Sequence, residues 1–251
     1  MMAYADRMHL AFARSVASRP PAAPPIRWIV RHPADEEGHV TEAEPRSARG
    51  QRTRAKLLAA GKVVFERDGF LDARITDIAS EAQVSHGAFY HYFESKESLF
   101  REIAEEVEVR LVAMDDISDA PHDPVERIRA ANRSYLSAYR KEARIMRVIE
   151  EVSRYDAEVR KVRTKRDDEL AARLEASIAR LQADGVADPA IDKRYAATAL
   201  GSMVARFAET MFVAGGRYSF DAAVEQLTLL WANALGLTVT AKPARAKPKS
   251  A

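Results

Sequence analysis

Residues 75–100 read ITDIASEAQVSHGAFYHYFESKESLF, and this stretch decides the fold. Ile78, Ala79 and Ala82 form one small apolar face on a predicted helix, and Phe89 and Phe93 stand four residues apart on a second helix. Only a three-residue turn joins the two, which is typical of a helix-turn-helix. We interpret the two phenylalanines as core residues, which is compatible with DNA binding on the opposite face.

The opposite face of the second helix presents small and polar side chains. Gly87, Ala88 and His91 lie away from the two phenylalanines, and Tyr90 and Tyr92 lie on the flanks. A short helix with this surface fits the major groove of DNA, which is about 12 Å wide. The pattern therefore indicates a recognition helix.

Phosphate contacts are predicted around this helix. Ser85 is expected to cap it and leave backbone N–H groups for a phosphate oxygen, and Lys96 adds a positive charge near the start of the next helix. The alternative is that the aromatic residues 89–93 form a core patch of a small helical bundle. The spacing of Tyr90, His91 and Lys96 favours phosphate contact over that alternative.

This stretch resembles the DNA-binding domain of the TetR family of transcriptional regulators. The matching segments are Thr76–Ala79, Val84–Ser85, Phe89–Tyr90, Tyr92–Phe93 and Ser95–Leu99, and Thr53–Ala60 with Phe65 and Gly69 is similar to that family's first helix. The resemblance covers about 50 of the 251 residues, and beyond them it rests on helix number and order.

The resemblance implies DNA-binding roles for ten residues. Those assigned to the DNA backbone or to the surface around it are Thr53, Thr76, Ser85, Tyr90, His91 and Lys96, and those that approach bases are His86, Gly87, Ala88 and Tyr92. Gln83 stands where the family usually has Gly, which predicts a strained left-handed backbone in the turn. Ala88 replaces a frequent Thr, so its methyl group becomes a candidate thymine contact.

Proline placement divides the chain. Six of the eleven prolines lie in residues 1–45, and the proline-free run from Arg46 to Ala120 predicts a series of helices. We predict nine helices in an all-α, TetR-like architecture, with two separate helices covering 124–141 and 142–154. The predicted parts are a disordered or extended N-terminal extension (1–48), a helix-turn-helix domain (49–100), a ligand-binding and dimerisation domain (101–238) and a basic disordered tail (239–251).

Composition excludes several classes of protein. The chain has no cysteine, so it has no disulfide framework, thiolate zinc site or Cys nucleophile, and this fits a reducing cytoplasm. No apolar stretch is long enough to span a membrane. The net charge of +2 does not exclude nucleic acid, because a local patch binds phosphate. We expect a cytoplasmic protein.

Motifs for catalysis are missing from the sequence. The six histidines show no metal-ligand spacing, and no Gly-x-Ser-x-Gly elbow, Walker loop or dinucleotide fingerprint occurs. The charged run Arg160–Glu169 is interpreted as a solvated helix face. We therefore expect a protein that is not an enzyme and needs no cofactor or metal.

The last two predicted helices favour dimerisation. Apolar residues recur at steps of three and four along both helices, and the interface residues we predict are Leu200, Met211, Val224, Leu227 and Trp231. The open alternative is that either stripe belongs to the core of one chain. A twofold dimer suits two recognition helices on one duplex, and the resemblance implies a four-helix interface from these helices.

Helices between the head and these last two helices are candidates for an effector cavity. The pocket residues we predict are Tyr135, Tyr139, Met146, Ile149, Met203, Arg206 and Phe207. A close-packed core explains each of them equally well, and a salt bridge within the bundle is the alternative for Arg206. It is the family resemblance that implies a ligand, which would wedge between these helices and move the helix after Ser95.

Together these features predict a homodimeric regulator that binds palindromic operator DNA. We expect repression that a small, largely apolar effector relieves, with no membrane involvement. A ligand-independent architectural DNA-binding protein and a helical small-molecule-binding protein or enzyme remain as alternatives. The first would show weak sequence preference and steep salt dependence, and the second would bind a ligand but not DNA.

Overall fold

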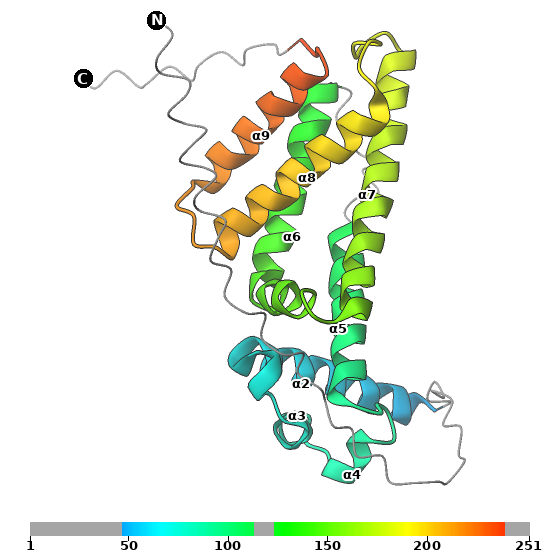
Figure 1. The fold of residues 1–251 in the computed structure, drawn as a ribbon, viewed down its shortest axis with the longest axis vertical. Coiled ribbons are helices and arrows are strands. Elements are labelled where there is room, and N and C mark those ends of the chain that lie inside the picture. The colour runs from blue at the N-terminus through cyan, green and yellow to red at the C-terminus, as the bar shows by residue number, and fades with distance from the viewer. Residues whose placement is uncertain (1–46, 113–122, 239–251) are drawn as a thin grey trace, which may run out of the picture. The chain divides into compact units, whose positions relative to one another are not determined.

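The computed structural model describes residues 47–112 and 123–238. Within these ranges the chain forms eight helices and no strand, which confirms the predicted all-α class. Figure 1 shows their arrangement. In chain order the helices are α2 (Ala48–Asp72), α3 (Ile75–Glu81), α4 (His86–Phe89), α5 (Lys96–Val112), α6 (Pro124–Val152), α7 (Ala157–Ala183), α8 (Lys193–Phe212) and α9 (Phe220–Ala234). The predicted tail 239–251 and nearly all of the predicted extension 1–48 lie outside the described residues.

Helices α2 to α4 form the head. Ser47 caps α2 by accepting a hydrogen bond from the backbone N–H of Gly50 at 3.1 Å. Gly69 breaks the helical geometry with a φ of 78°. A Cβ at Gly61 would lie 2.7 Å from Leu99 Cδ2, so the glycine allows α2 and α5 to approach closely.

Helix α5 leaves the head and enters the body. Ser95 and Ser98 cap it reciprocally, because each backbone N–H donates to the other's Oγ, at 3.2 and 3.1 Å. Its inner side packs against α2, α6 and α7, with Phe100, Ile103 and Leu111 almost fully buried. One element therefore touches both the head and the body.

The body is built from α6 to α9 with the upper part of α5. Helix α8 packs along α7, and α9 packs along α6 (Figure 1). Aspartates cap three of these helices: Asp123, Asp156 and Asp192 each accept hydrogen bonds from backbone N–H groups in the first turn. Helix α8 therefore begins directly after Asp192.

One helix stands where the sequence predicted two. Helix α6 runs without interruption from Pro124 to Val152, across the predicted boundary between Lys141 and Glu142. No Gly or Pro lies at that boundary, and Tyr139 before it and Ile145 after it are both buried in the core. The prediction of nine helices was wrong at this position.

Residues 47–112 and 123–238 contain neither a membrane-spanning helix nor a metal-binding cluster. None of their helices combines the length and apolar character that crossing a lipid bilayer requires. These residues also contain no group of three or more acidic or histidine side chains placed to hold a metal ion.

Candidate DNA-binding and effector sites

The turn between α3 and α4 has the geometry of a helix-turn-helix. The backbone N–H of Val84 donates to the carbonyl of Ala79 at 3.0 Å, which closes the turn. Gln83 adopts a φ of 57°, the only non-glycine residue with positive φ in the described part of the chain. The left-handed backbone predicted for Gln83 is therefore confirmed.

Helix α4 is anchored on one side and exposed on the other. Phe89 and Phe93 are buried in the head and stack near each other, with ring centroids 5.8 Å apart. Ser85 caps the helix, since its Oγ accepts from the backbone N–H of Ala88 at 3.2 Å. The regular helix ends at Phe89, and the chain continues as turns.

The exposed side of α4 gathers several of the predicted DNA-binding residues. His86, Gly87 and His91 are exposed, and the ring of Tyr90, half exposed at 51%, lies edge-on to that of His86 with centroids 5.4 Å apart. Thr76 at the start of α3 is exposed as well. Imidazole and phenol groups on one surface offer both donors and acceptors to a base edge or a phosphate.

Three predicted residues lie beside this surface and not on it. Tyr92 is half-buried and packs against the core of the head, and Ala88 is half-buried. Thr53 is half-buried on α2, where its hydroxyl donates to the carbonyl of Arg49 at 3.1 Å. The exposed residues named above are thus better candidates for direct contact with DNA than these three.

The geometry of Lys96 contradicts the predicted phosphate contact. Its Nζ donates to the carbonyls of Phe70 at 2.8 Å, Ala73 at 3.0 Å and Leu71 at 3.3 Å, and lies 4.7 Å from the Phe70 ring centroid. Burial lowers the pKa of this ammonium. All three donors of Lys96 are used at the end of α2, so the residue joins α5 to α2.

Arg74 is a cation that the sequence analysis missed. It is the exposed residue immediately before α3, two positions from Thr76, and it makes no ion pair with a described residue. The available signal was a basic side chain at the start of the first helix of the motif. Arg74 is therefore a better candidate than Lys96 for a phosphate ligand.

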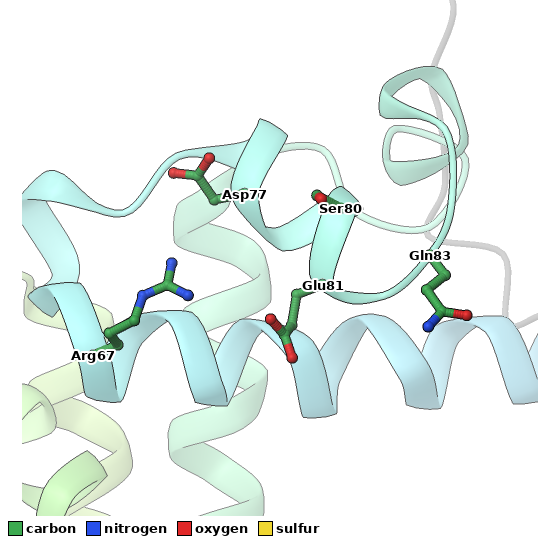
Figure 2. A pocket seen from close by; sticks show the side chains of 5 residues that line it. All are labelled: Arg67, Asp77, Ser80, Glu81 and Gln83. Atoms are coloured by element: carbon green, nitrogen blue, oxygen red, sulfur yellow. The ribbon is translucent and has the colours of Figure 1, made fainter.

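A polar hollow of about 430 Å³ lies between α2 and α3. Figure 2 shows Arg67 of α2 pointing up between the carboxylates of Asp77 and Glu81 on α3, with Gln83 at the far end. Arg67 is also paired with Asp68 at 2.7 Å. Phosphate would be repelled by the two carboxylates, so this hollow is not part of the DNA-binding surface.

The predicted effector residues are mostly core. Tyr135, Tyr139, Met146 and Ile149 are buried, and the Tyr139 ring stacks on Phe212 with centroids 6.3 Å apart. Arg206 departs from the prediction: its side chain is 73% exposed and pairs with Glu209 at 2.7 Å. The ion pair observed for Arg206 lies within α8 at the protein surface, and not inside the bundle as the alternative had it.

Met203 and Phe207 lie on the same helix as Arg206 but are half-buried. The Phe207 ring packs on Tyr218, with centroids 4.8 Å apart. The structure thus places the predicted pocket residues in two groups, a buried one on α6 and a half-buried one on α8, with Arg206 outside both.

A buried charge pair joins α5 to α7. An Arg166 Nη lies 3.0 Å from a Glu108 carboxylate oxygen, and the two side chains are only 5% and 2% exposed. Burial raises the pKa of Glu108 against the opposing effect of Arg166, and burial also raises the pKa of Tyr135 nearby to about 12. The Tyr135 hydroxyl has no hydrogen-bond partner among the described residues.

This pair corrects the interpretation of Arg160–Glu169 as a solvated face. Most of that run is exposed, but Arg166 faces the core. The missed signal was the register of α5, where Glu108 falls between the buried positions Val107 and Leu111.

Most of the predicted dimer residues are buried within one chain. Val224, Leu227 and Trp231 on α9 are at most 6% exposed and face α6, and Leu200 on α8 is 9% exposed. Met211 is half-buried. The apolar stripes therefore form the core of the body, which was the alternative left open by the sequence. The outward side of the same helices presents Tyr195 and Leu230, 77% and 51% exposed.

Two family models match the chain. The model of bacterial regulatory proteins of the tetR family matches residues 57–103, and the model of the tetracyclin repressor-like C-terminal domain matches residues 121–235. The first covers the helix-turn-helix, and the second covers all of α6 to α9.

Curated relatives match about a quarter of the chain. The uncharacterized HTH-type transcriptional regulator YdgC of Bacillus subtilis is 38% identical over 56 residues, which are 22% of this chain and 29% of that protein. The HTH-type transcriptional repressor NicS of Pseudomonas putida is 37% identical over 62 residues, 25% of this chain and 29% of that protein. The chain thus matches less than a third of the length of these two relatives.

Solved structures share the fold over most of the described residues. A putative transcriptional regulator from Pseudomonas aeruginosa PAO1 gives a TM-score of 0.64 at 22% identity, over 76% of this chain and 92% of that one. FadR from Bacillus subtilis, solved in complex with stearoyl-CoA, gives 0.60 at 16% identity, over 70% and 96%. With both family models matched along one helical fold, the chain belongs to the tetR family of bacterial regulatory proteins.

Proposed function

We propose that the chain is a homodimeric transcriptional regulator that binds operator DNA of inverted symmetry. It represses, and a small, largely apolar effector releases it from the DNA. The observation that carries this proposal is the exposed side of α4, where His86, Tyr90 and His91 surround Gly87 while Phe89 holds the helix from behind. A Cβ at Gly87 would meet nothing within 4 Å, so this part of the helix is open to a base edge.

The residues around α4 divide into two roles. His86 lies in the first turn of the recognition helix, where side chains reach base edges in the major groove. Tyr90, Thr76 and Arg74 lie at the margins and would contact the DNA backbone. Base contacts would set the preferred sequence, and backbone contacts would set affinity for any duplex.

Dimerisation would use the outward side of α8 and α9. The inner sides of these helices are committed to the core, whereas Tyr195 and Leu230 are large apolar residues exposed on the outer sides. A twofold pairing through this surface would place two α4 helices on one face of a duplex.

Effector release would act through α5. Lys96 fastens the start of α5 to the end of α2, Arg101 pairs with Asp156 before α7 at 3.0 Å, and Glu108 pairs with Arg166 inside the body. A ligand that shifts α7 would therefore move α5 and, with it, the head.

Selection of bound fragments from genomic DNA by the purified protein tests the proposal. We expect a short inverted repeat to be enriched, and His86→Ala to lose about 1–3 kcal/mol of discrimination at one position of each half-site. Tyr90→Phe should weaken binding to all sequences equally. Binding without sequence preference and with steep salt dependence would indicate an architectural protein instead.

A further inference from the structure

A mostly apolar hollow of about 510 Å³ lies at the end of the body where α6 begins and α7 and α9 end (Figure 1). Its walls come from all three helices and include Ile128, Leu174, Ile178, Leu181, Trp231 and Leu235. Small-molecule sites in proteins have volumes of roughly 300–1,000 Å³ and mainly apolar walls. None of the residues predicted as the effector pocket lines this hollow.

One wall contains a buried donor that the protein does not satisfy. The Trp231 side chain is 6% exposed, and its indole Nε1–H has no acceptor among the described residues. The nearby amide of Asn132 donates to the Thr228 hydroxyl at 3.3 Å, and that hydroxyl donates to the Val224 carbonyl at 2.7 Å. These neighbours satisfy each other, and the Trp231 N–H, which is shielded from solvent, has no partner among the described residues, so the part of Trp231 that lines the hollow is its apolar ring.

The rim of the hollow carries a small excess of positive charge. Arg127 of α6 and Arg180 of α7 line it together with one carboxylate, that of Asp184. Arg180 is exposed and donates to the Ser177 hydroxyl at 3.1 Å, a neutral partner. An anionic group at the rim could therefore accept charge-assisted hydrogen bonds from the Arg180 guanidinium.

We propose that this hollow binds a small aromatic or aliphatic molecule that carries one anionic group. The apolar part lies between α6, α7 and α9 against the Trp231 ring, and the anion meets Arg180. The regulatory role rests on the proposed function: Trp231 is on α9, whose outer side would form the dimer interface. A ligand against Trp231 would shift α9 relative to α6 and change the spacing of the two recognition helices.

Trp231 itself gives the readout. The chain has two tryptophans, Trp28 and Trp231, so Trp28→Phe leaves Trp231 as the only one. The probe is 1-anilinonaphthalene-8-sulfonate, which combines an aromatic body with one anionic group and accepts energy from tryptophan. We expect saturable quenching of Trp231 with one probe per chain. N-phenyl-1-naphthylamine, which lacks the sulfonate, should bind more weakly.

Matched variants locate the bound probe. Ala131 lines the hollow and is exposed on α6, so Ala131→Phe should fill the space and weaken binding of both probes by about tenfold or more. Ala172→Phe, at an exposed position of α7 away from the hollow, is the control. Arg180→Gln should weaken the sulfonate probe by about fivefold and leave the neutral one unchanged, whereas Arg154→Gln changes neither. Thermal melts confirm that all variants fold.

Two results would overturn the proposal. One is unchanged quenching in Ala131→Phe, and the other is equal loss of both probes in Arg180→Gln. Because the titration contains no DNA, its failure leaves the proposed DNA binding intact. Failure of the fragment selection, with probe binding retained, removes the regulatory role and leaves the binding site.

Discussion

Gln83 and Lys96 show how single positions in the head are constrained. Gln83 has a φ of 57°, a conformation in which a side chain crowds its own backbone. Lys96 lies in a different environment, because its ammonium serves three carbonyls at the end of α2. Gln83 adds backbone strain to the folded state. Lys96 removes the cost of leaving three carbonyl groups without a hydrogen-bond donor.

Gln83→Gly should raise the free energy of unfolding by about 0.5–1 kcal/mol, because glycine adopts positive φ without crowding and loses only part of the gain to unfolded-chain entropy. Urea denaturation followed by circular dichroism measures the change. Gln83→Ala is the control and should give no gain, since alanine keeps the Cβ. A glycine variant that is no more stable than the alanine variant would contradict the strain.

Lys96→Met should lower the free energy of unfolding by about 1–2 kcal/mol, because the buried carbonyls lose their donor while the aliphatic stem remains. The dependence of DNA affinity on salt should stay the same, since no phosphate contact is lost. Arg74→Gln is the matched variant: its stability should be unchanged, and its slope of log affinity against log salt should fall by about 0.9. Exchanged behaviour of the two variants would restore Lys96 as the phosphate ligand.

At the scale of elements, α5 and α7 are joined by charges inside an otherwise apolar layer. The Glu108–Arg166 pair has unsatisfied polar atoms around it, including the Tyr135 hydroxyl. Such pairs add little stability over apolar residues, but removing one partner leaves an uncompensated charge. The pair therefore holds α5 and α7 in one register and offers a place where a small shift has a large energetic effect.

Arg166→Met should cost about 3–5 kcal/mol, because the Glu108 carboxyl stays buried without the guanidinium that compensates its charge. The double variant Glu108→Leu with Arg166→Met should recover most of that loss. Denaturant unfolding of the single variants Arg166→Met and Glu108→Leu and of the double variant, beside the parent chain, measures these values. Additive losses in the double variant would show that the two side chains do not act as a pair.

The same carboxyl predicts a pH dependence. Because the folded pKa of Glu108 is raised above its ordinary value of 4.5, the folded state holds this proton more tightly than the unfolded state. Its contribution to stability is largest below pH 4.5 and is lost as the pH rises through the folded pKa. In the double variant Glu108→Leu with Arg166→Met, stability measured from pH 4 to 8 should lack this fall. An identical pH profile in the parent chain and the double variant would contradict the raised pKa.

At the scale of the whole molecule, the inner sides of α8 and α9 pack in the core, and their outer sides are exposed. Their inner sides close the body, as the burial of Val224 and Trp231 shows. Their outer sides expose Tyr195 and Leu230, and a stable homodimer needs an apolar surface of this kind. The residues that decide folding and those that would decide assembly are thus neighbours on one helix.

Leu230→Arg should give a folded monomer, because a charge would enter the proposed interface without disturbing the core. Sedimentation velocity should show half the mass of the parent protein, the thermal melt should remain cooperative, and operator affinity should fall about 100-fold or more with loss of bivalent binding. Gln226→Arg tests the neighbouring exposed turn of α9 and should weaken the dimer less than Leu230→Arg does. A stable dimer of Leu230→Arg would exclude this side of α9 as the interface.

Local sequence patterns predict the structure of the head well and the structure of the body less well. The spacing of Phe89 and Phe93, the cap at Ser85 and the left-handed Gln83 follow from interactions within a few residues, and each is found as predicted. The boundary inside α6 was misplaced because propensity alone leaves a helix free to continue wherever no residue breaks it. Only packing along its full length decides that it does continue.

The sequence by itself determined an all-helical protein with a recognition helix near residue 86, because a helix-turn-helix depends on the spacing of residues that are close together in the chain. Tertiary structure alone decided which side of α9 faces inward, that Arg166 is buried and that Lys96 binds carbonyls. A periodic stripe or a charged residue has the same local pattern whether its partner lies in the same chain, another chain or DNA. The partner is chosen by contacts between residues far apart in the chain, and those exist only in the folded molecule.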